Sequence, residues 1–211
     1  VALIVDCMRG ITRYDRNLRK GIWVDDPFLD TNRSIKGASL GILGFGRIGK
    51  EVADQAVGLG MKVYYYDVFR ASPEVEAQYS VTYMPLDEII GSVDCISINM
   101  PYLPENHHFC DKAFFEKMRS DAYFVNAARG PIVDEHALYE ALKNDVIKGA
   151  GIDVFENEPY PLPELYELDN IVVTPHQASN PLATRLAMCV ETMTGLSEFF
   201  NGGQPYNIVN P

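Results

Sequence analysis

Three groups of side chains that can bind an anion or move a proton lie far apart in the sequence. They are Arg129, the acidic stretch of Asp153, Glu156 and Glu158, and His176. The planar guanidinium of arginine matches the geometry of a carboxylate. An imidazole can give or take a proton near neutral pH, and a neighbouring carboxylate favours its protonated form. Each group alone is more often a solvated charge, a loop residue or a structural histidine. Together they could hold a small carboxylic acid and transfer a proton to it.

A glycine-rich segment, Gly-Phe-Gly-Arg-Ile-Gly at residues 44–49, predicts a dinucleotide site. It follows the apolar residues 39–43 and opens a helical pattern. In a strand–turn–helix unit Gly44 would permit a tight turn, Gly46 would let the backbone approach a pyrophosphate, and Gly49 would let helix and strand pack closely. The N-terminus of the helix then points free N–H groups at the phosphates.

Asp67 supplies the second part of this site. It lies eighteen residues past Gly49, at the end of the run 61–66. A carboxylate there can accept hydrogen bonds from both hydroxyls of an adenosine ribose, whereas a 2′-phosphate would meet like charge, so we expect NAD rather than NADP. A nicotinamide can give or take a hydride. A nicotinamide, an arginine that binds a carboxylate and a histidine that transfers a proton could together interconvert a 2-keto acid and a 2-hydroxy acid.

The apolar pattern predicts an α/β fold, a doubly wound parallel sheet of the Rossmann type, because short strand-like runs alternate with helical patterns. Ligands of such sheets bind beyond the carboxyl ends of the strands, where Arg129, Asp153 and His176 would converge. The predicted strands cover residues 39–43, 62–67, 80–83, 95–99, 122–126, 149–154 and 171–174, and the predicted helices cover residues 50–58, 86–90, 111–118, 134–144 and 180–200.

Residues 1–36 do not follow this alternation and are predicted to form a helical arm or hinge. A helix from residue 1 to about residue 10 leads through a turn at Lys20-Gly21 into an irregular stretch over residues 23–27. The arm could lead to another domain or pack on a second subunit, and we expect a homodimer through it. Residues 37–211 are predicted to form the NAD-binding Rossmann domain with a C-terminal return helix.

The composition bounds the partners. The net charge of −11 argues against nucleic acid, whose binding depends on clustered Lys and Arg. No apolar run approaches the roughly 18–20 residues that span a bilayer, so no membrane association is expected. The four cysteines form no Cys-x-x-Cys pair, which fits a reducing cytoplasm, and Cys95 is expected to be a core residue. Because the first residue is Val1 rather than Met, we expect a piece of a longer chain.

These motifs, in this order, resemble the NAD-binding domain of the D-isomer-specific 2-hydroxyacid dehydrogenases. The resemblance covers nearly the whole chain. It includes the glycine segment, Asn-Ala-Ala-Arg-Gly at residues 126–130, Gly-Ile-Asp-Val-Phe-Glu-Asn-Glu-Pro at residues 151–159, Thr-Pro-His at residues 174–176, and a return segment at residues 207–210. The family's substrate domain would precede Val1, so the chain is expected to bind NAD(H) but to turn over substrate poorly.

The resemblance implies a role for each matched residue. Arg129 would hold the substrate carboxylate, His176 would be the acid/base, and Glu158 would pair with His176. On the cofactor, Asp153 would contact the nicotinamide end and Asp67 the ribose. The remaining predicted contacts are the backbone of Arg47 and Ile48 at the pyrophosphate, Met100, Pro101 and Asn106 along the adenosine, and Ala127 and Ala128 near the nicotinamide ribose.

Other interpretations remain open from the sequence. An NADH-sensing protein similar to the corepressors that share this fold would use the nucleotide to control assembly, and a dedicated assembly module is a third interpretation. Gln177 stands where the family more often has an aliphatic residue, which affects the expected substrate preference. No metal site is expected at His107 and His108, because adjacent histidines should point apart and no further ligand completes a set.

Overall fold

The computed structural model describes residues 1–23, 32–205 and 208. The chain divides into two compact units, Val1–Pro175 and His176–Pro211. Each unit is described by itself.

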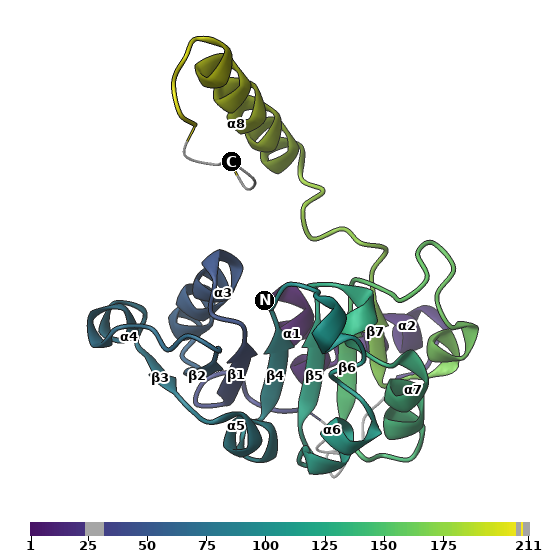
Figure 1. Cartoon of the computed structure of the whole chain (residues 1–211). Coiled ribbons are helices and arrows are strands. Elements are labelled where there is room, and N and C mark those ends of the chain that lie inside the picture. Colours follow the sequence, from purple (N-terminus) through teal and green to yellow (C-terminus); the bar gives the residue numbers. More distant parts are fainter. Residues whose placement is uncertain (24–31, 206–207, 209–211) are drawn as a thin grey trace. The chain divides into compact units, whose positions relative to one another are not determined.

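A seven-stranded parallel sheet forms the centre of the first unit (Figure 1), with the strand order β3-β2-β1-β4-β5-β6-β7. The strands are β1 (Ser39–Leu43), β2 (Lys62–Tyr66), β3 (Val81–Tyr83), β4 (Cys95–Ile98), β5 (Tyr123–Asn126), β6 (Gly149–Ile152) and β7 (Ile171–Val173). Every residue of β4, β5 and β6 is buried. Helices cover both faces of these strands, which explains their nearly continuous apolar sequence. The seven predicted strands are confirmed, with ends that differ by at most two residues.

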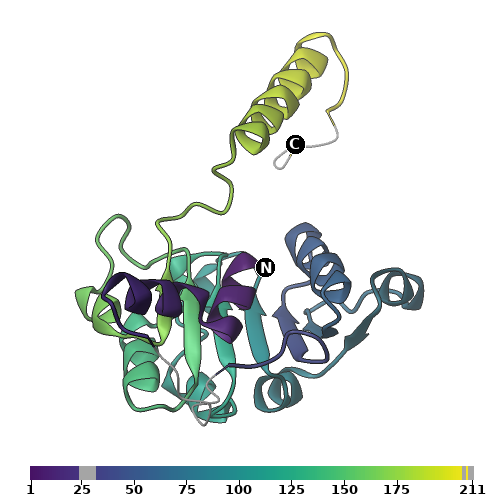
Figure 2. The same ribbon diagram turned by 180° about the vertical axis from the view of Figure 1, so that it is seen from behind.

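Helices form a layer on each face of the sheet, and each layer has its own hydrophobic core (Figures 1 and 2). One layer contains α5 (Leu86–Ser92), α6 (Lys112–Lys117) and α7 (Glu135–Lys143), and the other contains α1 (Ala2–Arg9), α3 (Arg47–Gly58) and α4 (Pro73–Tyr79). Short α2 (Ile11–Arg19) follows α1, and three 3₁₀ turns, η1 (Pro104–Asn106), η2 (Gly130–Ile132) and η3 (Pro163–Glu167), lie in the loops. The doubly wound Rossmann-type fold is therefore confirmed.

Three helices differ from the sequence-based prediction, and one of them, α2, was not predicted as a separate helix. α3 begins at Arg47 rather than at residue 50, because Gly46 is the N-cap and has an extended backbone. The glycine segment thus supplies the first turn of the helix as well as the loop before it. α4 was not predicted, although Ser72 as N-cap, Pro73 at the first helical position and two acidic residues in the first turn are typical signals of a helix start.

The first helix of the predicted arm belongs to the core. Ile4 and Met8 are fully buried, and α1 packs against β5, β6 and β7. A side chain at Gly151 in β6 would lie 2.8 Å from Cys7 Sγ, so glycine at this position allows the close approach of helix and strand. The boundary expected at residues 36 and 37 falls inside the first unit. The irregular stretch expected over residues 23–27 lies, beyond Trp23, outside the described residues.

The second unit contains α8 (Leu182–Phe200), where the sequence predicts a helix over residues 180–200. None of its residues is buried. The predicted return segment at residues 207–210 lies outside the described residues except for Ile208. Within the described part of the chain, every helix is too short or too polar to cross a membrane.

Candidate functional site

The glycine turn between β1 and α3 has the geometry that its motif predicts. Gly44 has a φ of 95°, and a Cβ atom there would lie 2.5 Å from the backbone nitrogen of Met100. A Cβ atom on Gly49 would lie 2.2 Å from the carbonyl oxygen of Gly44. Gly46 differs from both, because a Cβ atom there would meet no atom within 4 Å. Two glycines are therefore needed for packing, while the third faces open space.

The N-terminus of α3 provides unoccupied hydrogen-bond donors. No side chain caps this end of the helix. The first N–H groups of a helix have no intrahelical acceptor, and the helix dipole adds partial positive charge there. Arg47 and Ile48 in the first turn are both exposed. This helix end can therefore receive the pyrophosphate of a dinucleotide.

Asp67 lies beside the glycine turn at the end of β2. One carboxylate oxygen accepts the Phe45 N–H at 2.7 Å, and the other accepts the Phe69 N–H at 3.1 Å. These two bonds fix the orientation of the carboxylate. Each oxygen has a second lone pair, so the group can still accept hydrogen bonds from two ribose hydroxyls.

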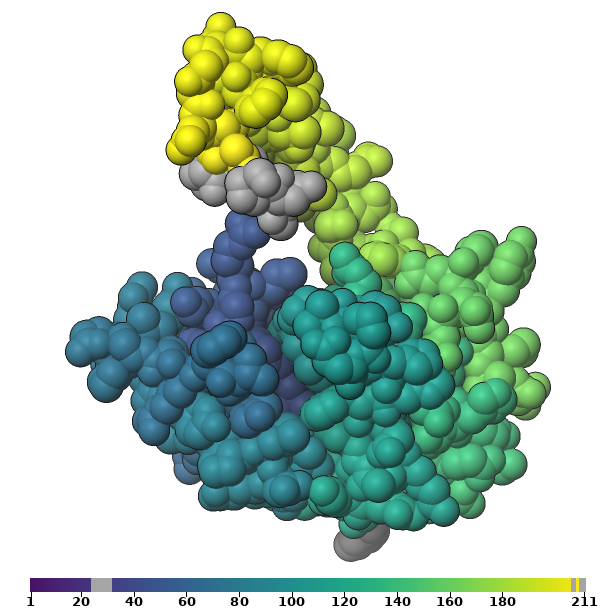
Figure 3. Space-filling model, viewed as in Figure 1, coloured from purple at the N-terminus to yellow at the C-terminus, as the bar shows by residue number. Residues whose placement is uncertain are grey.

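A cleft of about 660 Å³ gathers most of the predicted contacts (Figure 3). In Figure 3 the surface is hollowed between the dark blue segment around α3 and the teal segment that follows β4 and β5. The cleft lies at the carboxyl ends of β1, β4 and β5, where the strand order reverses between β1 and β4. Open α/β sheets bind their ligands at such a switch point. The predicted residues that line the cleft are Gly46, Arg47, Ile48, Met100, Pro101, Ala127, Ala128 and Arg129.

Asn99 and Tyr102 also line the cleft and were not predicted. Asn99 directly follows β4, and its N–H donates to the Leu43 carbonyl at 2.7 Å, which holds the ends of β4 and β1 together. The available signal was their position, because Asn99 ends the predicted strand over residues 95–99 and Tyr102 follows Met100 and Pro101.

Asn106 is not among the residues that line the cleft. Its side-chain oxygen accepts the Leu103 N–H at 2.8 Å, and its amide nitrogen donates to the Pro101 carbonyl at 2.7 Å. The side chain therefore closes the turn that presents Pro101. The predicted contact of Asn106 with adenosine stays a prediction.

Arg129 reaches the cleft from the loop after β5. Its side chain is exposed, and Nη1 donates to the Ala128 carbonyl at 2.6 Å. The loop is shaped by Asn126, which is 1% exposed. The Asn126 side chain donates to the Arg129 carbonyl and accepts the Ala128 N–H, both at 3.0 Å. Asn126 was identified only as part of a motif, and its structural task could not be read from spacing.

The three remaining predicted residues occupy different surroundings. Asp153 is 2% exposed and accepts the Thr174 hydroxyl at 2.5 Å, which joins the ends of β6 and β7. Glu158 is exposed, and its carboxylate accepts the Phe155 N–H at 3.0 Å. His176 is the first residue of the second unit. The predicted contact of Asp153 with nicotinamide and the pairing of Glu158 with His176 therefore stay predictions.

One expectation about histidines was wrong. The rings of His107 and His108 do not point apart but stack, with their centroids 3.9 Å apart. His108 Nε2 also lies 3.1 Å from a carboxylate oxygen of Glu156, close enough for an ion pair but not aligned as a hydrogen bond. Among the described residues, no group of three or more His, Cys, Asp or Glu side chains is arranged to hold a metal ion.

Comparison with known proteins agrees with this geometry. Residues 1–178 match the family described as D-isomer specific 2-hydroxyacid dehydrogenase, NAD binding domain. The chain is 38% identical over 212 residues to a glyoxylate reductase of Korarchaeum cryptofilum, an alignment that covers 99% of this chain and 64% of that protein.

Two solved structures are similar as well. The apo form of Rhodotorula graminis D-mandelate dehydrogenase superposes with a TM-score of 0.90 at 33% identity, covering 100% of this chain and 63% of that one. Lactobacillus jensenii D-lactate dehydrogenase with NAD+ superposes with a TM-score of 0.87 at 30% identity, covering 98% and 65%. This chain thus spans a little under two thirds of the length of these relatives. The cofactor of the domain is NAD. The chain belongs to the D-isomer specific 2-hydroxyacid dehydrogenase family.

Proposed function

We propose that this chain is the cofactor-binding domain of an oxidoreductase that transfers a hydride between NAD(H) and a small D-2-hydroxy or 2-keto acid. A substrate-binding part of the same protein would complete the cleft. We call this chain joined to that part the full-length enzyme. The names of relatives, such as the glyoxylate reductase of Korarchaeum cryptofilum, make glyoxylate the first substrate to test.

The observation that carries this proposal is a single cleft with two kinds of group. Gly46, Arg47 and Ile48 at the start of α3 line the cleft, and so does Arg129 from the loop after β5. The first group suits a pyrophosphate and the second suits a carboxylate. A guanidinium in the same cleft as the pyrophosphate site favours an enzyme with a carboxylate substrate over a protein that only binds the nucleotide.

The residues present fit NAD. The space beside Gly46 is open, the N-terminus of α3 is uncapped, and Asp67 is oriented by two backbone N–H groups. The acidic group at the ribose favours NAD over NADP, because a 2′-phosphate would be repelled.

Each catalytic residue has a defined task in this proposal. The bound cofactor supplies or accepts the hydride. Arg129 binds the substrate carboxylate through its planar fork and orients the adjacent carbonyl carbon. During reduction, the imidazolium of His176 donates a proton to the carbonyl oxygen, and during oxidation the neutral imidazole takes that proton back. The carboxylate of Glu158 stabilises the protonated imidazole. In the sequence, His176 follows the end of β7 after two residues, Thr174 and Pro175.

Cofactor binding can be tested on this chain directly. We expect saturable binding of NADH, detected by its fluorescence, with NADPH binding more weakly. Asp67→Ala should weaken NADH about tenfold, as expected for lost hydrogen bonds to a charged group, and should narrow the difference between NADH and NADPH. Asp54→Ala is the matched control, since Asp54 is an exposed acid on α3 that does not line the cleft. Equal affinity of the unmutated chain for both cofactors would contradict the role of Asp67.

Turnover separates the enzyme from an NADH-sensing protein of the same fold. The full-length enzyme should oxidise NADH in the presence of one or more acids from a panel that includes glyoxylate, hydroxypyruvate and pyruvate. An NADH-sensing protein would show no turnover but a change in assembly when NADH is added. That outcome would replace the proposed function.

We further propose that the chain forms a homodimer through its N-terminal segment. Around α2, apolar side chains face solvent: Ile11, Leu18 and Ile22 are 51–59% exposed, and Trp23 is 77% exposed. Analytical ultracentrifugation should show a dimer that Trp23→Ser weakens, while a monomer at all concentrations would contradict it. All four cysteines are free, which supports a cytoplasmic location in this proposal.

A further inference from the structure

The loop after β6 carries Glu158 and is tied at both ends to one buried carboxylate. Glu135, the first residue of α7, is 7% exposed. One of its oxygens accepts the Glu156 N–H at 2.7 Å, and the other accepts the Leu162 N–H at 3.1 Å. Glu158 lies between these two attachment points. The loop therefore cannot open at either end without breaking a bond to Glu135.

The attachment is reciprocal at one end. The Glu156 carboxylate accepts the Glu135 N–H at 2.9 Å, so each residue binds the backbone of the other. His108 approaches the second oxygen of Glu156 at 3.1 Å. The Glu135 N–H lies in the first turn of α7 and has no acceptor inside the helix, so the Glu156 carboxylate supplies one. A buried carboxylate is costly unless such partners satisfy it, so its geometry is strongly specified.

The same loop lies directly against the residue that follows Arg129. A Cβ atom on Gly130 would lie 1.9 Å from the carbonyl carbon and oxygen of Phe155 and 2.5 Å from the nitrogen of Glu156. Only glycine permits this approach. The loop that presents Arg129 and the loop that presents Glu158 are thus in backbone contact.

We propose that Glu135 is a positioning residue that fixes Glu158 relative to Arg129. The inference rests on the proposed roles of Arg129 and Glu158. Glu135 touches neither substrate nor cofactor in this scheme. It holds the two ends of the 156–162 loop while Gly130 fixes the distance to the arginine loop. The Phe155 N–H, which donates to Glu158 at 3.0 Å, reports whether the Glu158 side chain stays in place.

Hydrogen exchange of this chain tests the structural step. Glu135→Ala should speed exchange of the Glu156 and Leu162 amides, and of the Phe155 amide about tenfold, the effect of losing roughly 1.4 kcal/mol of local protection. Glu135→Gln keeps one acceptor oxygen but places an NH₂ group against an N–H group, so it should restore protection only in part.

Asp134→Ala is the matched control. Asp134 is the adjacent N-cap of the same helix and accepts the Ala137 N–H at 3.0 Å, without a bond to the loop. It should leave the Phe155 amide unchanged. If Glu135→Ala and Asp134→Ala affect Phe155 equally, the inference is wrong. NADH affinity should stay within about twofold in all three variants, because none of these residues lines the cleft.

Kinetics of the full-length enzyme test the functional step. Glu135→Ala should lower kcat by about tenfold or more with little change in the KM for NADH, and Glu135→Gln should recover part of the rate. Glu158→Gln separates the two proposals. If it lowers kcat and Glu135→Ala does not, Glu135 has no positioning role and the proposed function stands. If neither variant lowers kcat, Glu158 has no part in the reaction and both proposals about it fail.

Discussion

In the first unit, polar groups are arranged differently at the two ends of the parallel strands. We call the end where the strands finish the carboxyl edge and the end where they begin the amino edge. At the carboxyl edge of β1, β4 and β5, the cleft of about 660 Å³ is lined by backbone and by exposed side chains such as Arg129. At the amino edge, the charges are matched with one another. Asp94 and Asp121 pair there with Arg33 and Arg119.

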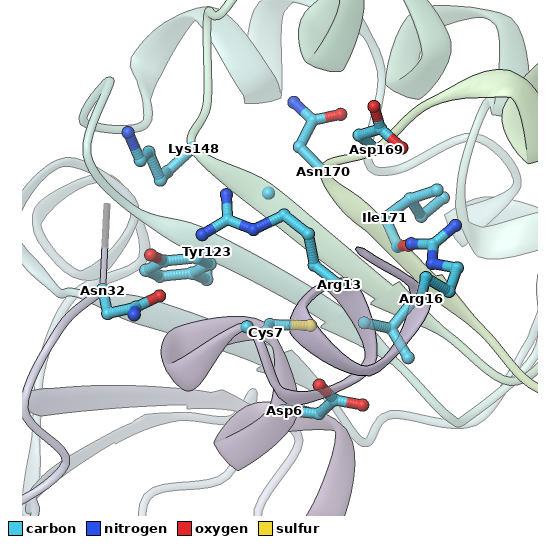
Figure 4. A pocket seen from close by; sticks show the side chains of 13 residues that line it. Asp6, Cys7, Arg13, Arg16, Asn32, Tyr123, Lys148, Asp169, Asn170 and Ile171 are labelled. Atoms are coloured by element: carbon cyan, nitrogen blue, oxygen red, sulfur yellow. The ribbon is translucent and has the colours of Figure 1, made fainter. Parts of the chain in front are cut away.

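At the amino edge, residues of α1 and α2 line a small hollow. Its volume is about 40 Å³, and Tyr123, Gly149 and Ile171, which line it, are the first residues of β5, β6 and β7. In Figure 4 the Arg13 side chain extends across the strands between Lys148 and Tyr123. One water needs about 10–15 Å³ of such space, so the hollow could hold a few waters but not a nucleotide.

Because of this difference, we expect substitutions at one edge to affect ligand binding and substitutions at the other to affect stability. Groups at the carboxyl edge are left accessible for a ligand, so their removal should change function more than folding. Groups at the amino edge satisfy one another, so their removal should change folding more than function. Each of the following variants tests one side of this contrast.

His176→Ala should have the largest effect. In the full-length enzyme, kcat should fall about 10²–10⁴-fold, the usual contribution of a general acid, while the melting temperature stays nearly constant. His136→Ala is the control, because His136 is an exposed histidine on α7. Unchanged turnover in the His176 variant would remove the proposed acid/base.

Gly46→Ala should block the cofactor without disturbing the fold. The added methyl group meets no protein atom within 4 Å, and Gly46 lines the cleft. We expect NADH to bind roughly a hundredfold more weakly, a loss of about 2.7 kcal/mol, with an unchanged melting temperature. Gly58→Ala at the other end of α3 is the control, since a methyl group there also meets nothing within 4 Å. Normal NADH affinity in the Gly46 variant would show that the backbone does not approach a ligand here.

Asp94→Ala should show the opposite behaviour at the amino edge. Asp94 accepts the Ser39 N–H at 2.8 Å and the Ser39 hydroxyl at 2.9 Å, besides pairing with Arg33 and Arg119. Its loss leaves the Ser39 N–H and hydroxyl without this acceptor, while Arg33 and Arg119 keep Asp121, so the free energy of unfolding should fall by about 2 kcal/mol. The melting temperature should drop by roughly 4–8 °C.

NADH affinity is the informative control for this variant. It should stay unchanged, and weaker binding would mean that the two edges are not independent. Asp87→Ala, which removes an exposed pair with Lys117, should cost less than about 0.5 kcal/mol.

Periodicity and motif chemistry predicted the sheet and most of the cleft for physical reasons. Strands buried on both faces are mostly apolar, so the run that forms β1 was visible in the sequence. Gly44 has a φ of 95°, and Gly49 has no room for a Cβ atom. Because only glycine suits such positions, the two glycines appear at a recognisable spacing in the sequence. Residues beyond strand ends then followed from topology.

Contacts between distant segments were not predictable in the same way. Helix α1 packs on the sheet where Gly151, 144 residues after Cys7, leaves room for the Cys7 side chain. Glu135 looked like an ordinary first-turn acid, and only the structure shows that it binds both ends of another loop. The stacking of His107 on His108 likewise depends on loop geometry that a rule about neighbouring residues does not contain.

Among the four test variants, Arg119→Met should have the smallest effect, because Arg33 still pairs with both Asp94 and Asp121. The size of this effect should depend on pH. Partial burial would raise the pKa of Asp121, but its contacts with Arg119 and Arg33 lower it below the ordinary value of 3.8. A lowered carboxyl pKa in the folded state contributes stability above the ordinary value, and this contribution is lost as the pH falls through the lowered pKa.

The Asp121 carboxylate is half exposed, so solvent screening limits the contribution of the pair to less than about 1 kcal/mol. The variant should therefore be slightly less stable than the parent near pH 7, and urea unfolding should show the gap narrowing below about pH 4. A gap that persists or widens in acid would mean that Arg119 stabilises the fold through packing rather than through charge. Arg119 lies at the amino edge. NADH should therefore bind the Arg119→Met variant and the unmutated chain with the same affinity at every pH where both are folded. Equal affinity would show that charges at the amino edge do not affect the cofactor cleft.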